Sequence, residues 1–433
     1  MDLTTLTATE AAALIAKKEL SSVELTRACL DRIGLRNPDV CAFCHLDPEF
    51  SLAEAAKADG ESPRSPLHGV PFAVKDVIDT KDFPTELGTP IHVGRRPAED
   101  ANCVSLMRDG GAVLLGKVVS TEYALYKPNE TRHPMNLEHT PGGSSSGTGA
   151  AVCDRMVPIA FGNQTAGSLI RPAAFCGVYG LKPTHGTTDG TGILPLQLYF
   201  DTLGYMARSV ADLQAFYGMV SEQNQTMEWP LSKRPKIALC RTYQWEFAEP
   251  ESREILEAAA EQFGTLGAEV ETFELPAAYA DLVAVHRRVL YKGISQSLDA
   301  DYQSARDQMS EKVLEIIEEG RATTEDQYAE ALAYADQCRE SVNECFGEFD
   351  AIIAPSAPGE PPLGMATGDP IFQVAWTLLG VPCLNLPVGF GPHGLPLGVQ
   401  LIGRRHDDAR VLALGRHLMR EFQFIETRQV ANV

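Results

Sequence analysis

The segment "PGGSSSGTGAAV", residues 141–152, has the glycine and serine content of a flexible linker. A linker is out of place here, one third of the way into a chain with the composition of a compact globular protein. A second run of small residues, "NQTAGSLIRPAAFCG" at 163–177, places Ser168 24 positions after Ser144. The apolar segment "MVPIAFG" (156–162) is typical of a buried strand. The two serine-bearing runs therefore bracket a predicted strand of the core.

Short apolar segments that are rich in β-branched residues and bounded by glycine occur elsewhere along the chain. Residues 69–79 ("GVPFAVKDVID") and 111–119 ("GAVLLGKVV") fit buried strands. Residues 236–275 read as strand, helix and strand, which is a βαβ unit. Strand character returns at 351–355 ("AIIAP") and 397–403 ("LGVQLIG"). The pattern predicts a largely parallel or mixed sheet.

Helical signals surround these strands. Residues 7–10 and 21–24 fit capping boxes and are followed by apolar residues at helical spacing, which predicts two N-terminal helices. Residues 278–348 are helical almost throughout and form a predicted helical cover, and 407–422 closes with an amphipathic helix. We expect an α/β protein with a large mixed central sheet covered by helices on both faces. No linker divides the chain, so 1–433 is predicted to be a single domain.

The composition excludes several classes of function. The chain has 433 residues, 44% hydrophobic and 22% charged, with a formal net charge of −21. Such an acidic surface repels phosphate backbones and anionic lipid, so no direct nucleic-acid or membrane partner is expected. The N-terminus lacks the basic start and apolar core of a secretory signal. The longest apolar stretch, 374–390, is interrupted by Pro382, Asn385 and Pro387, so a cytoplasmic protein is predicted.

The ten cysteines are scattered, without the dense spacing of a disulfide scaffold. Cys41 and Cys44 form a lone CxxC beside His45, and a zinc ribbon or finger needs a second pair that the sequence lacks. We therefore expect free thiols and no metal site.

The serine-rich segment admits several motif interpretations. Residues 143–147 match the GxSxG nucleophile elbow, which requires a preceding strand, but "HPMNLEHTPG" (133–142) is a turn-rich loop. A phosphate-binding loop requires lysine where the chain has Thr148. A serine nucleophile also needs a base to take its proton, and the usual base is a histidine.

Lys75 comes directly after the apolar residues "GVPFAV" (69–74) of a predicted strand and has two interpretations. Most lysines in such a place extend to the surface. A buried lysine instead has a lowered pKa, because desolvation disfavours the ammonium form, and its neutral amine can then act as a base.

Five segments together make the chain resemble the amidase signature enzymes. They cover nearly the whole sequence: "LHGVPFAVKDVID", "GKVVSTEYALYKPNETRHPMNLEHTPGGSSSGTGAAV", "FGNQTAGSLIRPAAFCGVYGLKPTHG", "DTLGYMARSVADL" and "LLGVPCLNLPVGFGPHGLPLGVQLIGRRHDD". The resemblance implies the family's fold and its Ser–cis-Ser–Lys triad. Lys75 would be the base, Ser144 the bridging serine after a cis peptide bond, and Ser168 the nucleophile.

The same resemblance implies an oxyanion hole built from backbone N–H groups of Thr165, Ala166, Gly167 and Ser168. Many relatives have Asp-Thr-Gly-Gly-Ser where this chain has Gln164-Thr-Ala-Gly-Ser168, and Arg-Asn-Pro where it has Arg132-His133-Pro134. Ala166 adds a Cβ beside the oxyanion site and restricts positive φ. These departures leave the triad intact and put the substrate subgroup in question.

The resemblance implies an amidohydrolase that cleaves a carboxylic amide through an acyl-enzyme, with esters and carbamates as further candidate substrates and no cofactor. The catalytic core is expected at about 60–220 and 350–433, with specificity in the cover at 278–348. Tyr123 and Tyr126 either line the pocket or are core aromatics. The alternative function is the glutaminase (A) subunit of a tRNA-dependent amidotransferase. The expected partner is a small amide-type substrate, and a homodimer is the commonest symmetric state.

Overall fold

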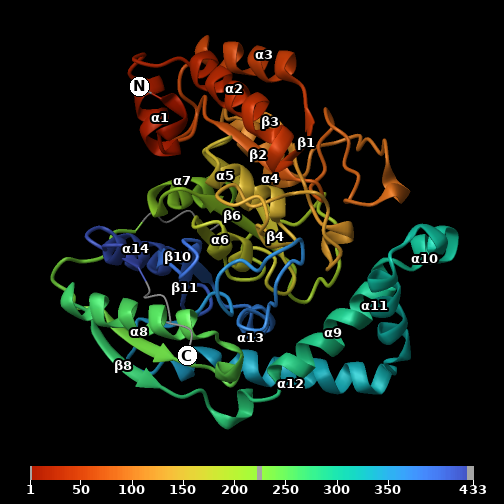
Figure 1. Cartoon of the computed structure of the whole chain (residues 1–433), viewed down its shortest axis with the longest axis vertical. Coiled ribbons are helices and arrows are strands. Elements are labelled where there is room, and N and C mark those ends of the chain that lie inside the picture. Colours follow the sequence, from red (N-terminus) through yellow and green to blue (C-terminus); the bar gives the residue numbers. More distant parts are fainter. Residues whose placement is uncertain (1, 222–226, 427–433) are drawn as a thin grey trace.

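The computed structural model describes residues 2–221 and 227–426 of the chain, and a mixed sheet runs through its length (Figure 1). The strand order is β1-β3-β2-β4-β6-β5-β10-β11-β9-β7-β8, and β12 pairs with β10. The strands are β1 (Phe43–Leu46), β2 (Pro71–Lys75), β3 (Val113–Val118), β4 (Ile159–Gln164), β5 (Tyr179–Lys182), β6 (Thr202–Ala207), β7 (Lys236–Cys240), β8 (Glu269–Phe273), β9 (Ala351–Pro355), β10 (Cys383–Phe390), β11 (Pro396–Ile402) and β12 (Ile425–Glu426).

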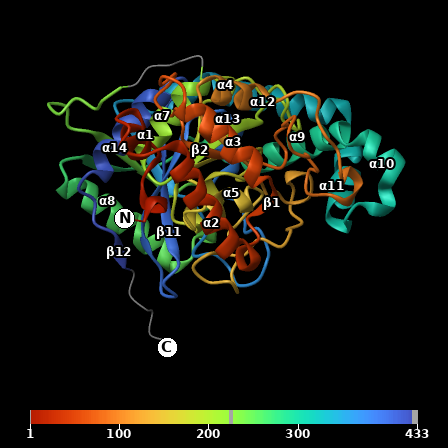
Figure 2. The same cartoon turned by 90° about the horizontal axis from the view of Figure 1, so that it is seen from above.

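Helices cover both faces of this sheet (Figures 1 and 2). The α-helices are α1 (Ala8–Ala16), α2 (Ser22–Val40), α3 (Pro48–Asp59), α4 (Asn102–Asp109), α5 (Ser146–Cys153), α6 (Ile170–Phe175), α7 (Val210–Val220), α8 (Pro250–Thr265), α9 (Leu282–Ser297), α10 (Asp299–Ala305), α11 (Glu311–Ala322), α12 (Glu325–Cys345), α13 (Val374–Leu379) and α14 (Asp408–Met419). The predicted fold class, an α/β protein with a large mixed central sheet, is confirmed.

The sheet has two parallel groups of three strands joined by antiparallel pairs, with an antiparallel edge pair of β1 with β3 and a parallel pair of β10 with β12. Strand β2 pairs in parallel with β3 and β4, and β7 pairs in parallel with β8 and β9, whereas β4 through β11 are joined by antiparallel pairs. The βαβ unit predicted at 236–275 is β7, α8 and β8. The predicted strands at 69–79, 111–119, 351–355 and 397–403 are β2, β3, β9 and β11.

The sequence did not predict strands β1, β5, β6, β10 and β12. In β10, Asn385 and Pro387 interrupt the apolar pattern, and the register of its pairing with β11 shifts between Pro387 and Gly389. Proline removes a ladder donor and is tolerated in a sheet at such an irregularity. The Asn385 amide is satisfied inside the protein, since its Nδ2 donates to the Val178 carbonyl at 2.8 Å.

The two N-terminal helices begin at the predicted capping boxes. The Thr7 hydroxyl accepts the Glu10 N–H while the Glu10 carboxylate accepts the Thr7 N–H, and Ser21 and Glu24 repeat this exchange at α2. The segment 278–348 contains helices α9 to α12, which form an arm on one side of the sheet with α10 at its tip (Figures 1 and 2).

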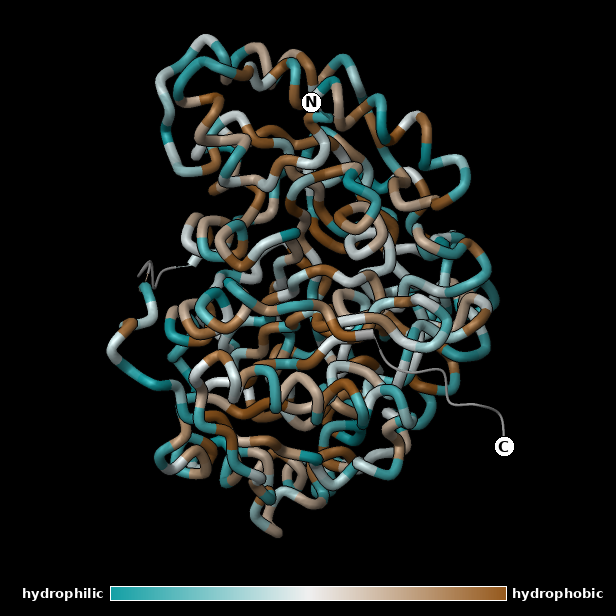
Figure 3. The backbone as a smooth tube through the Cα atoms, turned by 60° about the vertical axis from the view of Figure 1, so that its left-hand side comes forward, coloured by the Kyte–Doolittle hydropathy of each residue, from teal (hydrophilic) through white to brown (hydrophobic). Residues whose placement is uncertain are grey.

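Apolar side chains fill the space between the sheet and its helices, and hydrophobic segments run through the interior of the chain trace (Figure 3). An aromatic cluster fixes strands β2, β4 and β6 against α7. Phe161 of β4 lies 6.2 Å from Phe72, 5.4 Å from Tyr205 and 4.4 Å from Phe216, measured between ring centroids. The packing holds the carboxyl ends of parallel strands β2 and β4 side by side.

Within residues 2–221 and 227–426, no helix is both long and apolar enough to cross a membrane. The predicted core segment 350–433 extends past the described residues, because 427–433 lie outside them.

Candidate active site

Lys75 is the last residue of β2, and its side chain is fully buried. Its Nζ donates hydrogen bonds to Ser144 Oγ at 2.6 Å and to Asn163 Oδ1 at 2.7 Å. Burial lowers the pKa of Lys75 well below its ordinary value, the positive charge of Arg171 lowers it further, and the negative charge of Asp201 opposes the shift. Burial therefore favours the neutral amine, which is the state a base requires.

The glycine-rich run around Ser144 is buried and held at several points. The Gly143–Ser144 peptide bond is cis, as the resemblance predicts. The Gly143 carbonyl accepts from Arg171 Nη2 at 2.6 Å, and the Ser144 carbonyl accepts from the Thr121 N–H at 3.3 Å. A Cβ on Gly143 would lie 2.7 Å from Thr367 Cγ2, so glycine is required there. The run is a fixed turn and has no linker role.

Ser168 lies directly after a loop of small residues that leaves β4. The Ser168 carbonyl accepts from the Ser145 N–H at 3.2 Å, so the two serine-bearing segments are in contact. The chain then enters α6, where the Arg171 N–H donates to the Gly167 carbonyl at 3.1 Å. The structure therefore brings together Lys75, Ser144 and the segment that carries Ser168.

The N–H groups of residues 165–168 donate no hydrogen bond to any described residue. The next two N–H groups, of Leu169 and Ile170, are bound by Gln164 Oε1 at 3.0 Å each. Ala166 is not among the described residues with positive φ, so its Cβ causes no backbone conflict in this loop. Four successive unpaired N–H donors beside a serine form a group that can bind a developing oxyanion.

Two carbonyl groups of the same loop are bound by side chains from distant helices. His286 Nε2, on α9, donates to the Thr165 carbonyl at 2.9 Å, and Thr377 Oγ1, on α13, donates to the Ala166 carbonyl at 2.7 Å. Burial lowers the pKa of His286 to about 4, so its ring is neutral and acts as a hydrogen-bond donor. These contacts orient the peptide units whose N–H groups are free.

The loop opens on two adjoining cavities. The inner chamber, of about 20 Å³, is lined by Ala124, Leu125, Tyr126, Thr165, Ala166, Ser168, Arg171, Leu290 and Pro370. The outer pocket, of about 700 Å³, is lined by Tyr126, Pro128, Val283, His286, Arg287, Leu290, Tyr291, Lys312, residues 366–371 and Val374. The outer pocket draws on the helical cover through α9 and α11, which is the region where specificity is expected.

The two tyrosines considered for substrate contact are placed differently. Tyr126 lines both cavities. Tyr123 lies in the core, is fully buried, and donates from its hydroxyl to Asp301 Oδ2 at 2.8 Å. It is absent from the described lining of either cavity.

Sequence reasoning missed several polar residues of this site. Asn163 holds the Lys75 amine, and His286 and Thr377 hold the oxyanion loop. Asp201, whose pKa burial raises to about 6, contributes the negative charge near Lys75. The sequence could have indicated Asn163, because it is a polar residue at the end of an apolar strand. It could not indicate His286 and Thr377, because their hydrogen-bond partners are far away in the sequence.

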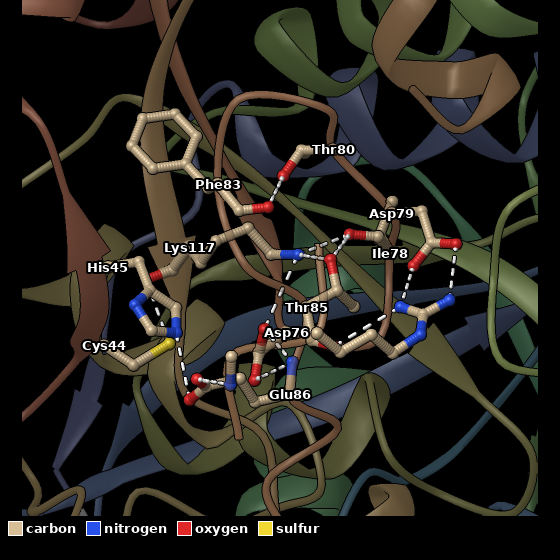
Figure 4. A network of polar contacts seen from close by, with 12 residues as sticks. Cys44, His45, Asp76, Ile78, Asp79, Thr80, Phe83, Thr85, Glu86 and Lys117 are labelled. Atoms are coloured by element: carbon tan, nitrogen blue, oxygen red, sulfur yellow. Dashed lines mark hydrogen bonds and ion pairs between the residues drawn. The ribbon is translucent and has the colours of Figure 1, made fainter. Parts of the chain in front are cut away.

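One cluster of metal-ligating residue types lies beside the site. Cys44, His45 and Asp76 place their ligand atoms within 4.8 Å of one another, and no other such group occurs in the part of the chain that the structure describes (Figure 4). Cys41 does not belong to the cluster. The Asp76 carboxylate lies 3.5 Å from the ammonium group of the fully buried Lys117. We interpret the cluster as part of an ion-pair network that fixes the backbone after Lys75.

The described cysteines are all free thiols, as predicted.

The contact between His286 and Thr165 leads to a prediction. Replacing His286 with phenylalanine keeps the stacking on Phe200, whose ring lies 4.6 Å away, but leaves the Thr165 carbonyl buried without a donor. We expect a stability loss of about 1 to 3 kcal/mol and a fall in kcat of roughly tenfold or more. Thermal unfolding and steady-state kinetics measure the two effects.

The matched control is His185→Phe. His185 also bonds a carbonyl, that of Leu198 at 3.0 Å, and its pKa is lowered by burial to about 4, but it lies outside both cavity linings. This variant should lose stability without a comparable loss of kcat. Equal kcat losses in the two variants would show that His286 acts only through general stability.

Comparisons of the chain with a family model, with known sequences and with solved structures agree with one another. Residues 24–412 match the family model described as Amidase. The chain is 33% identical over 465 aligned positions to the A subunit of the glutamyl-tRNA(Gln) amidotransferase of Chloroflexus aggregans, covering 95% of each chain. Among solved structures, it superposes with a TM-score of 0.90 on an amidase at 27% identity (96% and 100% coverage). It superposes with a TM-score of 0.83 on the peptide amidase of Stenotrophomonas maltophilia at 28% identity (96% and 97% coverage).

Proposed function

The chain belongs to the amidase signature family and is an enzyme that acts on linear amide C–N bonds, and from this premise we propose that Ser168 is its nucleophile. In this proposal Ser144 and Lys75 form the proton relay, and an acyl-enzyme is the intermediate. The observation that carries the proposal is the 2.6 Å contact between Lys75 Nζ and Ser144 Oγ in a fully buried site next to the Ser168 segment.

The first half-reaction forms the acyl-enzyme. Ser168 Oγ attacks the carbonyl carbon as its proton passes to Ser144, whose own proton passes to the neutral Lys75 amine. Asn163 Oδ1 accepts one Lys75 N–H at 2.7 Å and holds the amine beside Ser144, whose Oγ lies 2.6 Å from Nζ. When the C–N bond breaks, the relay returns the proton to the leaving amine.

The negative charge of the tetrahedral intermediate falls on the former carbonyl oxygen. We assign its stabilisation to the N–H groups of Thr165, Ala166, Gly167 and Ser168, which have no acceptor among the described residues. In the second half-reaction, water takes the place of the amine. The water loses a proton to the relay as its oxygen bonds to the acyl carbon. The bond to Ser168 Oγ then breaks, the relay returns the proton to that oxygen, and the acid is released.

The lowered pKa of Lys75 predicts the pH dependence of the free enzyme. The neutral amine is the active form, so kcat/KM should rise with pH through the Lys75 pKa and level off well below pH 10.5. A pH profile on a neutral amide measures this midpoint. A rise centred near 10.5 would mean that the buried amine is charged at neutral pH and would contradict its role as base.

A substrate panel tests the proposed function. Purified protein and Ser168→Ala are compared on aliphatic amides, anilides, an aryl ester, a carbamate and glutamine. Amide turnover that vanishes in the variant supports a free-standing amidohydrolase, and the ester and carbamate results define its range. Turnover that persists in Ser168→Ala would refute the assignment of the nucleophile.

A second candidate function is the glutaminase component of a tRNA-dependent amidotransferase. It is favoured by the 33% identity to such a component over 95% of both chains. In that case glutamine is the substrate, the product ammonia passes to a partner protein, and the isolated chain is inactive on the other amides. Activity of the isolated chain on non-glutamine amides would exclude this candidate.

We further propose a cytoplasmic enzyme with a small-molecule amide as its partner and a homodimeric state. We also propose a single catalytic domain whose core comprises residues 60–220 and 350–433. The free cysteines and the net charge of −21 support the location and the absence of a direct nucleic-acid partner. Size-exclusion chromatography with light scattering tests the dimer.

A further inference from the structure

Two successive residues beside the inner chamber have an unusual backbone conformation. Tyr123 and Ala124 both have positive φ, of 49° and 57°, which residues with a Cβ rarely adopt. They belong to residues 121–126, which we call the wall turn, because Ala124, Leu125 and Tyr126 line the inner chamber. Tyr126 also lines the outer pocket. A turn in this conformation keeps its shape only where the contacts around it hold it.

One end of the wall turn is fixed to the candidate active site. The Thr121 N–H donates to the Ser144 carbonyl at 3.3 Å, and Thr121 Oγ1 donates to the Leu125 carbonyl at 2.6 Å. These two bonds hold the backbone where the turn begins and ends. They do not hold the side chains of Glu122 and Tyr123, both of which are fully buried.

Helices of the arm hold these two side chains. Tyr123 Oη donates to Asp301 Oδ2, on α10, at 2.8 Å, and His92 Nε2 donates to the same oxygen at 2.7 Å. Glu122 Oε1 accepts the N–H of Ser310, directly before α11, at 3.2 Å. Asp301 and Ser310 lie 178 and 188 positions away from the residues that they bind, on the outer end of the arm (Figure 2). The wall turn is therefore held from two sides, by the candidate active site and by the arm.

The Asp301 carboxylate is the central group of the contact with the arm. Burial and the hydrogen bond to Asp301 raise the pKa of Tyr123, so its hydroxyl stays protonated and is the donor. Hydrogen bonds to an ionised acceptor are stronger than neutral ones. The rings of His92 and Tyr123 also pack edge to face, with their centroids 6.0 Å apart. Removal of the carboxylate takes away the acceptor that the buried Tyr123 hydroxyl and the His92 N–H share, and an unpaired buried donor is costly.

We propose that Asp301 is a positioning residue, through which the arm sets the width of the inner chamber and so the size of the acyl group that the enzyme accepts. The inference rests on the amidohydrolase function proposed above. Asp301 is absent from the described lining of both cavities and acts through Tyr123 on Ala124, Leu125 and Tyr126. Because the chamber holds only about 20 Å³, a small displacement of this wall changes which groups fit.

The kinetic test compares Asp301→Ala with the wild type on acetamide and phenylacetamide, which both release ammonia. The bond between Thr121 and Ser144 remains in this variant, so kcat on acetamide should stay within about threefold, while KM rises roughly fivefold or more for one lost hydrogen bond. The KM of phenylacetamide should change less, because a wider chamber favours the larger acyl group. Tyr123→Phe keeps the ring but removes the same bond, and it should give the same pattern.

Asp299→Ala is the matched control. Asp299 lies on the same helix, α10, and forms an ion pair with Arg321, with no described contact to the wall turn. This variant should keep both kinetic constants of the wild type. Asp301→Asn keeps a carbonyl oxygen that can accept from Tyr123, and its KM on acetamide should lie between those of the wild type and Asp301→Ala.

Hydrogen exchange measures the wall turn independently of turnover. The backbone N–H groups of residues 121–126 should exchange roughly tenfold faster or more in Asp301→Ala and at the wild-type rate in Asp299→Ala. Faster exchange in a protein that hydrolyses no amide would support the positioning role even though the proposed function fails. Unchanged exchange in Asp301→Ala would overturn the proposal, as would faster exchange in an active enzyme whose KM values stay at the wild-type level. Equal changes of kcat and KM in Asp301→Ala and Asp299→Ala would also overturn it, because Asp301 would then act only through general stability.

Discussion

Replacing Ser168 with alanine should abolish amide hydrolysis, with a fall in kcat on the order of 10⁵- to 10⁶-fold. The reason is that no acyl-enzyme can form without the Oγ atom, whereas the oxyanion N–H groups and the cavities remain. Because Ser168 is buried and its Oγ donates no hydrogen bond to a described residue, the variant should keep its stability. Single-turnover kinetics and mass spectrometry of the trapped acyl group provide the measurement.

Ser146→Ala is the matched control for this experiment. Ser146 begins α5 in the same glycine-rich region, is 5% exposed, and its Oγ has no partner among the described residues. We expect this variant to remain within a few-fold of wild type. An acyl group found on Ser146 or on Ser144 in place of Ser168 would reassign the nucleophile.

Replacing Lys75 with methionine should lower kcat by about 10²- to 10⁴-fold while KM changes little. Methionine fills the buried space but cannot take the proton from Ser144, and Ser144 Oγ and Asn163 Oδ1 both lose their donor. The dependence of kcat/KM on the Lys75 pKa should vanish as well. A pH profile of the variant on an activated ester, which needs less proton transfer, tests this second expectation.

Lys182→Met controls for the loss of a buried amine. Lys182 is also fully buried, and it donates to the Val381 carbonyl at 2.6 Å and the Pro183 carbonyl at 3.0 Å, with no contact to the candidate site. It should lose stability but retain the wild-type pH profile. If both variants lose activity in proportion to stability and keep the same profile, Lys75 has a structural role only.

The predictability of the fold from sequence depended on how each strand is buried. Strands such as β2 and β3 are covered on both faces, so their apolar runs are continuous and recognisable. Strand β6 was not predicted, although it is buried at every position, and its Gly204 meets a requirement set elsewhere in the chain. A Cβ at Gly204 would lie 2.4 Å from Leu169 Cδ2, so this glycine makes room for the residue after Ser168. Such a requirement comes from a distant segment and leaves no local pattern.

The residues of the candidate site also differ in whether the sequence alone could identify them. Lys75, Ser144 and Ser168 were found because their segments match the family's motifs, although the burial that makes Lys75 a base was only one of two interpretations. His286 and Thr377 could not be found, since they lie 121 and 211 positions from the carbonyls they bind. A side chain that acts through one backbone carbonyl has no sequence signature of its own.

The hydrogen bond from His286 to Thr165 also constrains how this enzyme can evolve. The helix α9 supplies walls of the outer pocket and, from the same turns, the donor that orients the oxyanion loop. Substitutions that reshape substrate selection on this helix therefore reach the reaction centre directly. We therefore expect changes of specificity on α9 to preserve the reaction rate only where His286 is kept as the donor to the Thr165 carbonyl.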